Sequence, residues 1–257
     1  MVRLYRIMQY IIYHLLNKFF MNPIEKEIIK HMKNTNLTVF DVGCFRGTFT
    51  KKLNKYAKKT GINFNFFLFD PNPRVMNYIK DLLKIGTVKY FDLALDNTNM
   101  KKIFFLNNFF EPSGSSLNEV CKNDKKWNKT RKFVLQLLQP FKKIESFSEI
   151  NVQTQTIDNF CHTQGIKKID VLKIDSEANE LNVLKGAEKL LSKNKIYMIY
   201  TEISENKEKF DDKETMVLDY LKSYNFKLLK TYKIKSASFL SNIKATDNIL
   251  ISENFLS

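Results

Sequence analysis

Two acidic residues and two glycines form the first group of residues that could do chemistry. Asp41, Gly43 and Gly47 make the pattern D-x-G-x-x-x-G, and Asp70 follows 23 residues after Gly47. A glycine after a strand permits a tight turn and lets a ligand approach the backbone. An acid after the next strand is where a doubly wound fold binds the two hydroxyls of a ribose. An ordinary tight turn, and a helix cap at Asp70, are the alternatives.

Taken together, these two motifs predict an adenosine pocket that has no pyrophosphate site. The glycines do not follow the G-x-G-x-x-G spacing, and no lysine occupies the phosphate-loop position. Both absences argue against NAD and against a nucleoside triphosphate. The pattern therefore favours S-adenosylmethionine as the cofactor.

A second acidic group follows the run Lys173-Ile174. Asp175 at a strand end could accept a proton from a substrate hydroxyl, and Glu177 could reach the cleft from the start of a helix. Helix capping by Ser176 and favourable acids in the first helical turn are the alternative. Glu202 ends a later predicted strand and is the expected partner or substitute of Asp175. The predicted catalytic residues are therefore Asp175, Glu177 and Glu202. These acids could also hold a divalent ion, but we assign no metal ligand.

The elements that must position these residues alternate between strands and helices from about Leu37 onward. Such alternation predicts βαβ units and a mostly parallel sheet, and apolar strands indicate a sheet covered on both faces. We expect Ile103–Leu106 to form a hairpin arm with the third strand. The predicted strands are 37–40, 64–69, 88–95, 170–174, 196–203, 226–232 and 248–251.

The alternation breaks between residues 111 and 150. This stretch is lysine-rich, contains the only tryptophan, Trp127, and is too short to bury a core of its own. We therefore expect two parts: an N-terminal amphipathic segment, 1–36, and a domain, 37–257, with a helical insertion at about 111–150 over the ligand cleft.

The composition excludes several classes of protein. The 257 residues are 44% hydrophobic, which is too apolar for a disordered chain, and three scattered cysteines fit a reducing compartment. The net charge of +15 could favour binding of nucleic acid or of an acidic acceptor, although the lysines occur in scattered pairs. Apolar residues at helical spacing in residues 1–20 predict an amphipathic helix. It could pack on the domain or dock on an anionic membrane. We expect a cytoplasmic protein, with peripheral membrane contact left open.

Several segments in a fixed order resemble the FkbM family of methyltransferases, over roughly Leu37 to Ile251. The most specific segment is 169–187, and the family usually has D-V-E-G where this chain has Asp175-Ser176-Glu177-Ala178 and commonly has Glu at the position of Asp70. The other matching segments are 39–43, 69–73, 94–95, 113–117 and 156–160.

The resemblance implies a class I methyltransferase fold, which is Rossmann-like with a seven-stranded sheet and helices on both faces. It also implies S-adenosylmethionine as cofactor and O-methylation of a hydroxyl on a sugar, glycolipid or related metabolite. A nucleic-acid methyltransferase and a non-catalytic membrane-surface module are the alternatives, and nucleic acid is the less favoured partner. The residues expected to bind the cofactor are Asp41, Gly43, Phe45, Gly47, Asp70, Asn72 and Leu95.

Overall fold

The computed structural model describes residues 24–108, 114–119, 145, 147–206, 213–233 and 243–255. Residues 1–20, Trp127 and most of the expected insertion lie outside the described residues, so those predictions stay predictions. In the part of the chain that is described, no helix is long and apolar enough to cross a membrane.

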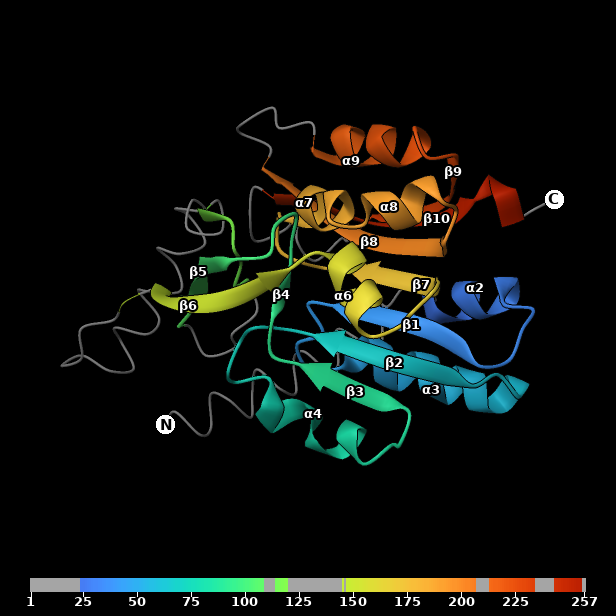
Figure 1. The fold of residues 1–257 in the computed structure, drawn as a ribbon, viewed down its shortest axis with the longest axis horizontal. Coiled ribbons are helices and arrows are strands. Elements are labelled where there is room, and N and C mark those ends of the chain that lie inside the picture. Colours follow the sequence, from blue (N-terminus) through green and yellow to red (C-terminus); the bar gives the residue numbers. More distant parts are fainter. Residues whose placement is uncertain are drawn as a thin grey trace.

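A seven-stranded sheet forms the centre of the molecule (Figure 1), with the strand order β3-β2-β1-β7-β8-β10-β9. All neighbouring pairs from β3 to β8 are parallel, whereas β10 is antiparallel to both β8 and β9. The mostly parallel class I methyltransferase sheet is therefore confirmed. The strands are β1 (Leu37–Val42), β2 (Phe64–Phe69), β3 (Val88–Phe91), β7 (Ile169–Ile174), β8 (Ile196–Asn206), β9 (Phe226–Lys233) and β10 (Ile243–Ser252).

Helices cover both faces of this sheet, each over its own apolar core. One face packs against α2 (Ile24–His31), α3 (Thr48–Thr60) and α4 (Met76–Leu83). The other face packs against α6 (Ile157–Thr163), α7 (Glu180–Lys185), α8 (Glu188–Ser192) and α9 (Lys213–Lys222), which lie in front of the sheet in Figure 1. A short 3-10 helix, η2 (Glu253–Phe255), ends the described chain. The central strands are apolar because both of their faces are buried.

A second, three-stranded sheet stands at the carboxyl ends of the parallel strands. It has the order β4-β6-β5 and consists of β4 (Ala94–Leu95), β5 (Lys101–Asn107) and β6 (Phe147–Gln155). This arrangement corrects two expectations. The segment 88–95 is not one strand, because its last two residues leave the main sheet and pair with β6. The arm at 103–106 pairs with β6 and not with the third strand.

Candidate active site

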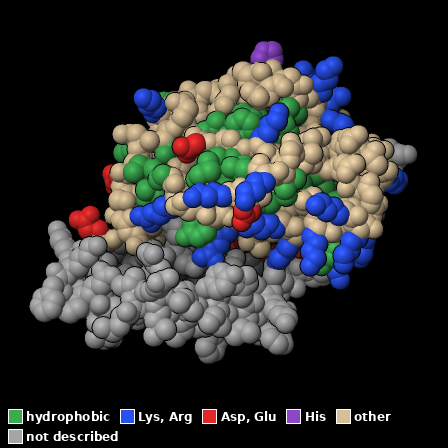
Figure 2. Space-filling model, turned by 90° about the horizontal axis from the view of Figure 1, so that it is seen from below, with side chains coloured by type: hydrophobic (Ala, Val, Ile, Leu, Met, Phe, Trp, Pro, Cys, Tyr) green, Lys and Arg blue, Asp and Glu red, His purple; other side chains and the backbone are tan. Residues whose placement is uncertain are grey.

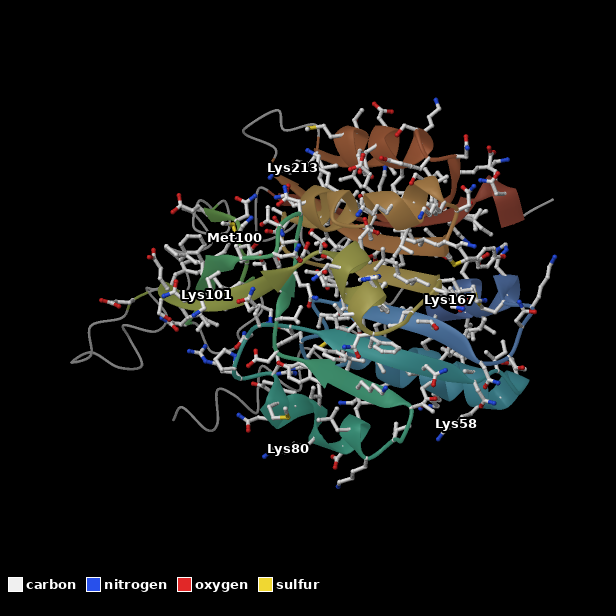
Figure 3. All side chains as sticks on the ribbon, viewed as in Figure 1. Lys58, Lys80, Met100, Lys101, Lys167 and Lys213 are labelled. Carbon is white, nitrogen blue, oxygen red and sulfur yellow. The ribbon has the colours of Figure 1, made fainter. Side chains whose placement is uncertain are left out.

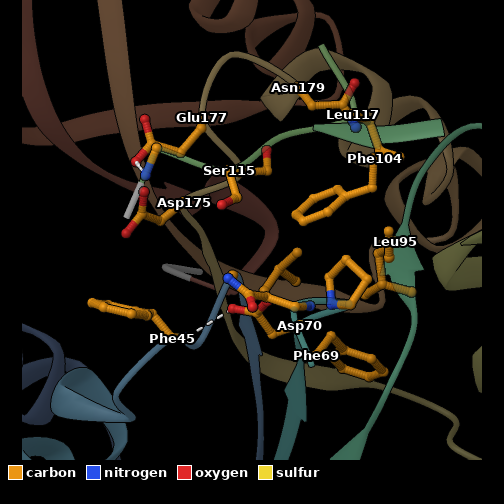
Figure 4. Close-up of a pocket in the computed structure, with 17 residues that line it drawn as sticks. Phe45, Phe69, Asp70, Leu95, Phe104, Ser115, Leu117, Asp175, Glu177 and Asn179 are labelled. Atoms are coloured by element: carbon orange, nitrogen blue, oxygen red, sulfur yellow. Dashed lines mark hydrogen bonds between the residues drawn. The ribbon is translucent and has the colours of Figure 1, made fainter. Parts of the chain in front are cut away.

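A pocket opens beyond the carboxyl ends of β1, β2 and β7, between the main sheet and the small one (Figure 4). The small sheet and the segment 114–119, between its strands β5 and β6, supply an apolar wall of Leu95, Phe104 and Leu117. Opposite this wall lie the carboxylates of Asp70, Asp175 and Glu177. Ligands of open α/β sheets bind at this edge, so the location agrees with the fold.

The turn after β1 passes so close to the end of β7 that it has no room for a side chain. Gly43 has φ +69°, and a Cβ atom there would lie 1.8 Å from the carbonyl oxygen of Asp175. The N–H of Asp175 donates to the carbonyl of Val42 at 3.1 Å, which holds the two strand ends together. Gly43 is therefore required by backbone contact, and the ends of the neighbouring parallel strands β1 and β7 form the pocket floor.

Asp70 holds the turn after β1 from the end of β2. Its Oδ2 accepts from the N–H of Phe45 at 2.9 Å, and its Oδ1 accepts from the N–H of Asn72 at 3.0 Å. Burial raises the pKa of Asp70 to about 6, although these two N–H groups favour the ionised form. The carboxylate lines the pocket, where its oxygens keep further lone pairs for accepting hydrogen bonds.

The turn after β7 contains two successive non-glycine residues with left-handed backbones. Glu177 has φ 54° and Ala178 has φ 75°. The buried Glu180 stabilises this turn, since its Oε1 accepts from the N–H of Ser176 at 3.2 Å, the hydroxyl of Ser176 at 3.1 Å and the N–H of Ala178 at 3.1 Å. Burial raises the pKa of Glu180, and these donors oppose that rise. Glu180 therefore has a structural task at the start of α7.

Residues 114–118 form a strap that crosses the pocket and binds the same turn. The hydroxyl of Ser116 donates to the carbonyls of Ser176 and Glu177 at 3.1 and 2.7 Å. Asn118 donates its amide to the carbonyl of Ala178 at 3.0 Å, and the N–H of Gly114 donates to Oε1 of Glu177 at 2.9 Å. The strap thus fixes the orientation of the Glu177 carboxylate at the pocket.

The buried ammonium group of Lys173 contacts both the turn after β1 and the turn after β7. Lys173 in β7 lies 3.1 Å from Oδ1 of Asp41 and 3.5 Å from Oδ2 of Asp175, and donates to the carbonyl of Gly43 at 2.7 Å. Burial lowers the pKa of Lys173, but attraction to Asp41 and Asp175 outweighs burial and raises it above the usual value. Lys173 therefore stays charged and holds the Asp175 carboxylate beside the Gly43 turn.

Seven of the ten predicted site residues line the pocket. They are Gly43, Phe45, Asp70, Asn72, Leu95, Asp175 and Glu177. Their roles toward a cofactor or acceptor stay predictions.

The other three predicted residues, Asp41, Gly47 and Glu202, do not line it. Asp41 is fully buried, accepts from the hydroxyl of Thr50 at 2.7 Å and pairs with Lys173, so it supports the pocket from inside the protein. Gly47 packs on α4, where an added Cβ would lie 2.2 Å from Cδ1 of Leu82.

Glu202 lies on β8 next to the pocket and belongs to a row of acids at one face of the sheet. It stands opposite Asp247 of β10, whose Oδ1 accepts from the hydroxyl of Tyr200 at 2.8 Å. Burial raises the pKa of Glu202 well above its usual value, and the charges of Asp175 and Asp247 raise it further. Burial and the neighbouring charges therefore both favour the protonated form of the Glu202 carboxyl, which can donate a hydrogen bond.

Sequence reasoning missed the residues that position the site. Lys173, Glu180 and Ser116 received no role, although a lysine inside the fully buried and mostly apolar strand Ile169–Ile174 signals a buried ion pair. The wall residue Phe104 gave no signal, because a phenylalanine in a strand is ordinary core.

The lining fits a cationic adenosine cofactor. Among the lining residues that the structure describes, Asp70, Asp175 and Glu177 are acidic and none is basic. The three carboxylates would repel a pyrophosphate, whereas they attract the sulfonium and the ammonium of a cationic cofactor. Within the described ranges, no three His, Cys, Asp or Glu side chains are grouped so as to hold a metal ion.

Comparison with known proteins identifies the family. The model of the methyltransferase FkbM domain matches residues 41–228. The 2-O-methyltransferase NoeI of Sinorhizobium fredii (strain NBRC 101917 / NGR234) is 21% identical over 189 residues, which are 71% of this chain and 69% of NoeI.

Solved structures give low similarity scores. Methyltransferase FkbM from Methylobacillus flagellatus KT has a TM-score of 0.48 at 11% identity, over 85% of this chain and 45% of that one. The N-methyltransferase NodS from Bradyrhizobium japonicum WM9 has a TM-score of 0.43 at 8% identity, over 89% and 93%. This chain thus spans less than half the length of the first of these proteins. The sequence match covers most of the chain, and the protein accordingly belongs to the FkbM family of S-adenosylmethionine-dependent methyltransferases.

Proposed function

We propose that the protein transfers a methyl group to a hydroxyl of a sugar, a glycolipid or a related metabolite. The similarity to NoeI, a 2-O-methyltransferase, supports an oxygen acceptor. The observation that carries the proposal is the set of three carboxylates, Asp70, Asp175 and Glu177, in a pocket whose described lining holds no basic residue. Such a lining suits a cationic methyl donor together with a neutral acceptor that must lose a proton.

The cofactor would lie between the Gly43 turn and the apolar wall. Asp70 would accept from the ribose hydroxyls, with Asn72 beside it and Leu95 against the adenine. When bound, S-adenosylmethionine supplies a methyl group activated by its sulfonium. The protein's main contribution is then alignment of the acceptor oxygen with that methyl group.

Asp175 is the proposed general base. Its side chain is 36% exposed, which lets an acceptor reach it, and Lys173 orients its carboxylate from below. A carboxylate in that position removes the hydroxyl proton as the new C–O bond forms. Glu177, held by Gly114 and Ser116, would bind a second hydroxyl of the acceptor. Glu202 is the proposed partner of Asp175 and, in its protonated form, a hydrogen-bond donor.

The deciding experiment is calorimetric titration with S-adenosylhomocysteine. We compare the wild type with Asp70→Ala and with Asp81→Ala, an exposed acid on α4 that pairs only with Lys84 among the described residues. Micromolar binding that Asp70→Ala abolishes and Asp81→Ala preserves would support the proposed pocket. Equal binding by all three proteins would contradict it.

The acceptor and the base are tested by one further assay. S-adenosylhomocysteine release is measured over a panel of sugars, glycolipids and amine analogues of the same sugars. We expect release only with hydroxyl acceptors, and Asp175→Asn should nearly abolish it while cofactor affinity changes little. Release with the amine analogues alone, or normal turnover in Asp175→Asn, would contradict this part.

A further inference from the structure

The helices on the two faces of the sheet differ sharply in charge. Together α2 and α3 carry seven lysines and two glutamates, and α3 has no acidic residue at all. The four helices on the opposite face carry four lysines and five acids. Seen from below, the molecule shows far more Lys and Arg than Asp and Glu side chains (Figure 2). The net charge of the chain is therefore unevenly distributed.

The two glutamates of α2 do not neutralise the lysines of α3. Glu25 is buried and interacts with the half-buried Lys52. Glu27 lies 3.0 Å from Lys30 and 3.8 Å from Lys230, so its charge is already shared. Lys55, Lys58 and Lys59 are exposed, and among the described residues no acid pairs with them.

The exposed lysines of α3 lie together because of the helical repeat. Phe49, Leu53 and Ala57 are buried against the sheet, which turns Lys51, Lys55, Lys58 and Lys59 toward the outside. In Figure 3, Lys58 extends away from the body of the protein. We call Lys26 on α2, with Lys51, Lys55, Lys58 and Lys59 on α3, the basic face.

We infer that the basic face binds an anionic lipid surface. Exposed lysines on one helical layer attract anionic headgroups, and each lysine near the surface strengthens binding about fivefold. All five residues of the face are lysine, which is a point charge for phosphate and lacks the planar fork that reads nucleotide bases.

The sequence next to this face favours lipid over nucleic acid. Residues 1–20 combine apolar residues at helical spacing with Arg6 and Lys18, and the chain then enters α2 at Ile24. A lipid surface can take both apolar and basic groups, whereas a nucleic-acid backbone takes only the basic ones. α3 begins at Thr48, directly after the turn whose residues Gly43 and Phe45 line the pocket. From there α3 runs away from the pocket to Thr60, so Lys55, Lys58 and Lys59 lie toward the opposite edge of the sheet.

The test is co-sedimentation with phosphatidylcholine vesicles that contain or lack phosphatidylglycerol. The basic-face variant is Lys55→Gln, Lys58→Gln, Lys59→Gln, and the control is Lys185→Gln, Lys189→Gln, Lys222→Gln. Both variants lose three charges, and all six side chains are exposed. We expect the wild type and the control to bind only the anionic vesicles, and the basic-face variant to bind them at least about tenfold more weakly. High salt should weaken the binding.

Three results would overturn the inference. They are no binding of the wild type to anionic vesicles, an equal loss in both variants, and tighter binding to a duplex oligonucleotide than to the vesicles. Titration of the same three proteins with S-adenosylhomocysteine tests the proposed methyltransferase function independently of lipid binding. Failure to bind this ligand would count against the methyltransferase pocket and leave the vesicle result to decide the lipid surface.

Discussion

The turn after β1 and the turn after β7 meet at the pocket, and each contains residues with positive φ. In the first turn the residues with positive φ are Gly43, Phe45 (φ 43°) and Gly47. In the second turn they are Glu177 and Ala178. In the first turn a side chain at Gly43 would strike the backbone of Asp175. The second turn has room for side chains but requires a backbone conformation that they disfavour.

Each turn is also held by a buried carboxylate from a neighbouring segment. Asp70 accepts from the N–H of Phe45 in the first turn, and Glu180 accepts from three donors at Ser176 and Ala178 in the second. The second turn has the additional strap of Ser116 and Asn118. The difference shows two ways to fix a functional turn. Glycine removes the strain at Gly43 and Gly47, whereas tertiary hydrogen bonds compensate for it at Phe45 and in the second turn.

The largest effect should come from Gly43→Ala. The added Cβ overlaps a backbone carbonyl that cannot move without separating β1 from β7, so we expect a loss of about 4 kcal/mol or more. Urea unfolding measures the loss. The matched control is Gly61→Ala, which has φ +72° but nothing within 4 Å and should lose only about 1 kcal/mol. Similar losses in both variants would mean that backbone contact does not define the first turn.

Protonation of Asp70 should change the stability of the protein and its affinity for the cofactor product in opposite directions. The pKa of Asp70 is about 6 in the folded protein against 3.8 for the unperturbed group, so its contribution to stability falls as pH rises through this window, by about 3 kcal/mol. Affinity for S-adenosylhomocysteine should move the other way, weakening about tenfold between pH 7 and pH 5, because only the ionised carboxylate accepts both ribose hydroxyls. Urea unfolding and calorimetry measure the two trends. Asp70→Asn should remove both, and parallel trends in the wild type would contradict this explanation.

Ser116→Ala should weaken the second turn selectively. Two carbonyls, of Ser176 and Glu177, lose their donor, and we expect a loss of about 1–3 kcal/mol together with weaker acceptor turnover. The control is Ser192→Ala, with an expected loss below about 0.5 kcal/mol, because this exposed serine donates, among the described residues, only to the carbonyl of Lys189. Unfolding free energies that agree between the two variants would show that the strap does not hold the turn.

Ala178→Gly should give the smallest effect, and one of opposite sign. Glycine adopts φ 75° without strain, so relief of this strain should stabilise the folded protein by about 0.5–1 kcal/mol. The greater conformational entropy of the unfolded chain with glycine reduces this gain. Ala57→Gly, inside α3, should instead destabilise the protein. Thermal melting compares them, and destabilisation by Ala178→Gly would show that the hydrogen bonds already remove the strain.

Much of the fold could be predicted because the main sheet follows local patterns. Apolar runs at β1, β2 and β7 alternate with helices whose buried stripes recur at helical spacing, and these two periods define a parallel sheet. The small sheet could not be predicted, since β4 is only two residues long and β6 is mostly polar. Its pairing depends on contacts between segments about 50 residues apart.

The sequence by itself determined the family, the parallel sheet and the pocket edge, with Gly43, Asp70 and Asp175 at strand ends, because these features depend on residue type and order. Only the tertiary structure decided that Asp41 faces Lys173 inside the protein, that Glu202 lies among other acids, and that Ser116 and Glu180 hold the turn after β7. The physical reason is that the direction of a buried side chain depends on partners distant in the sequence. Local spacing carries no information about those partners.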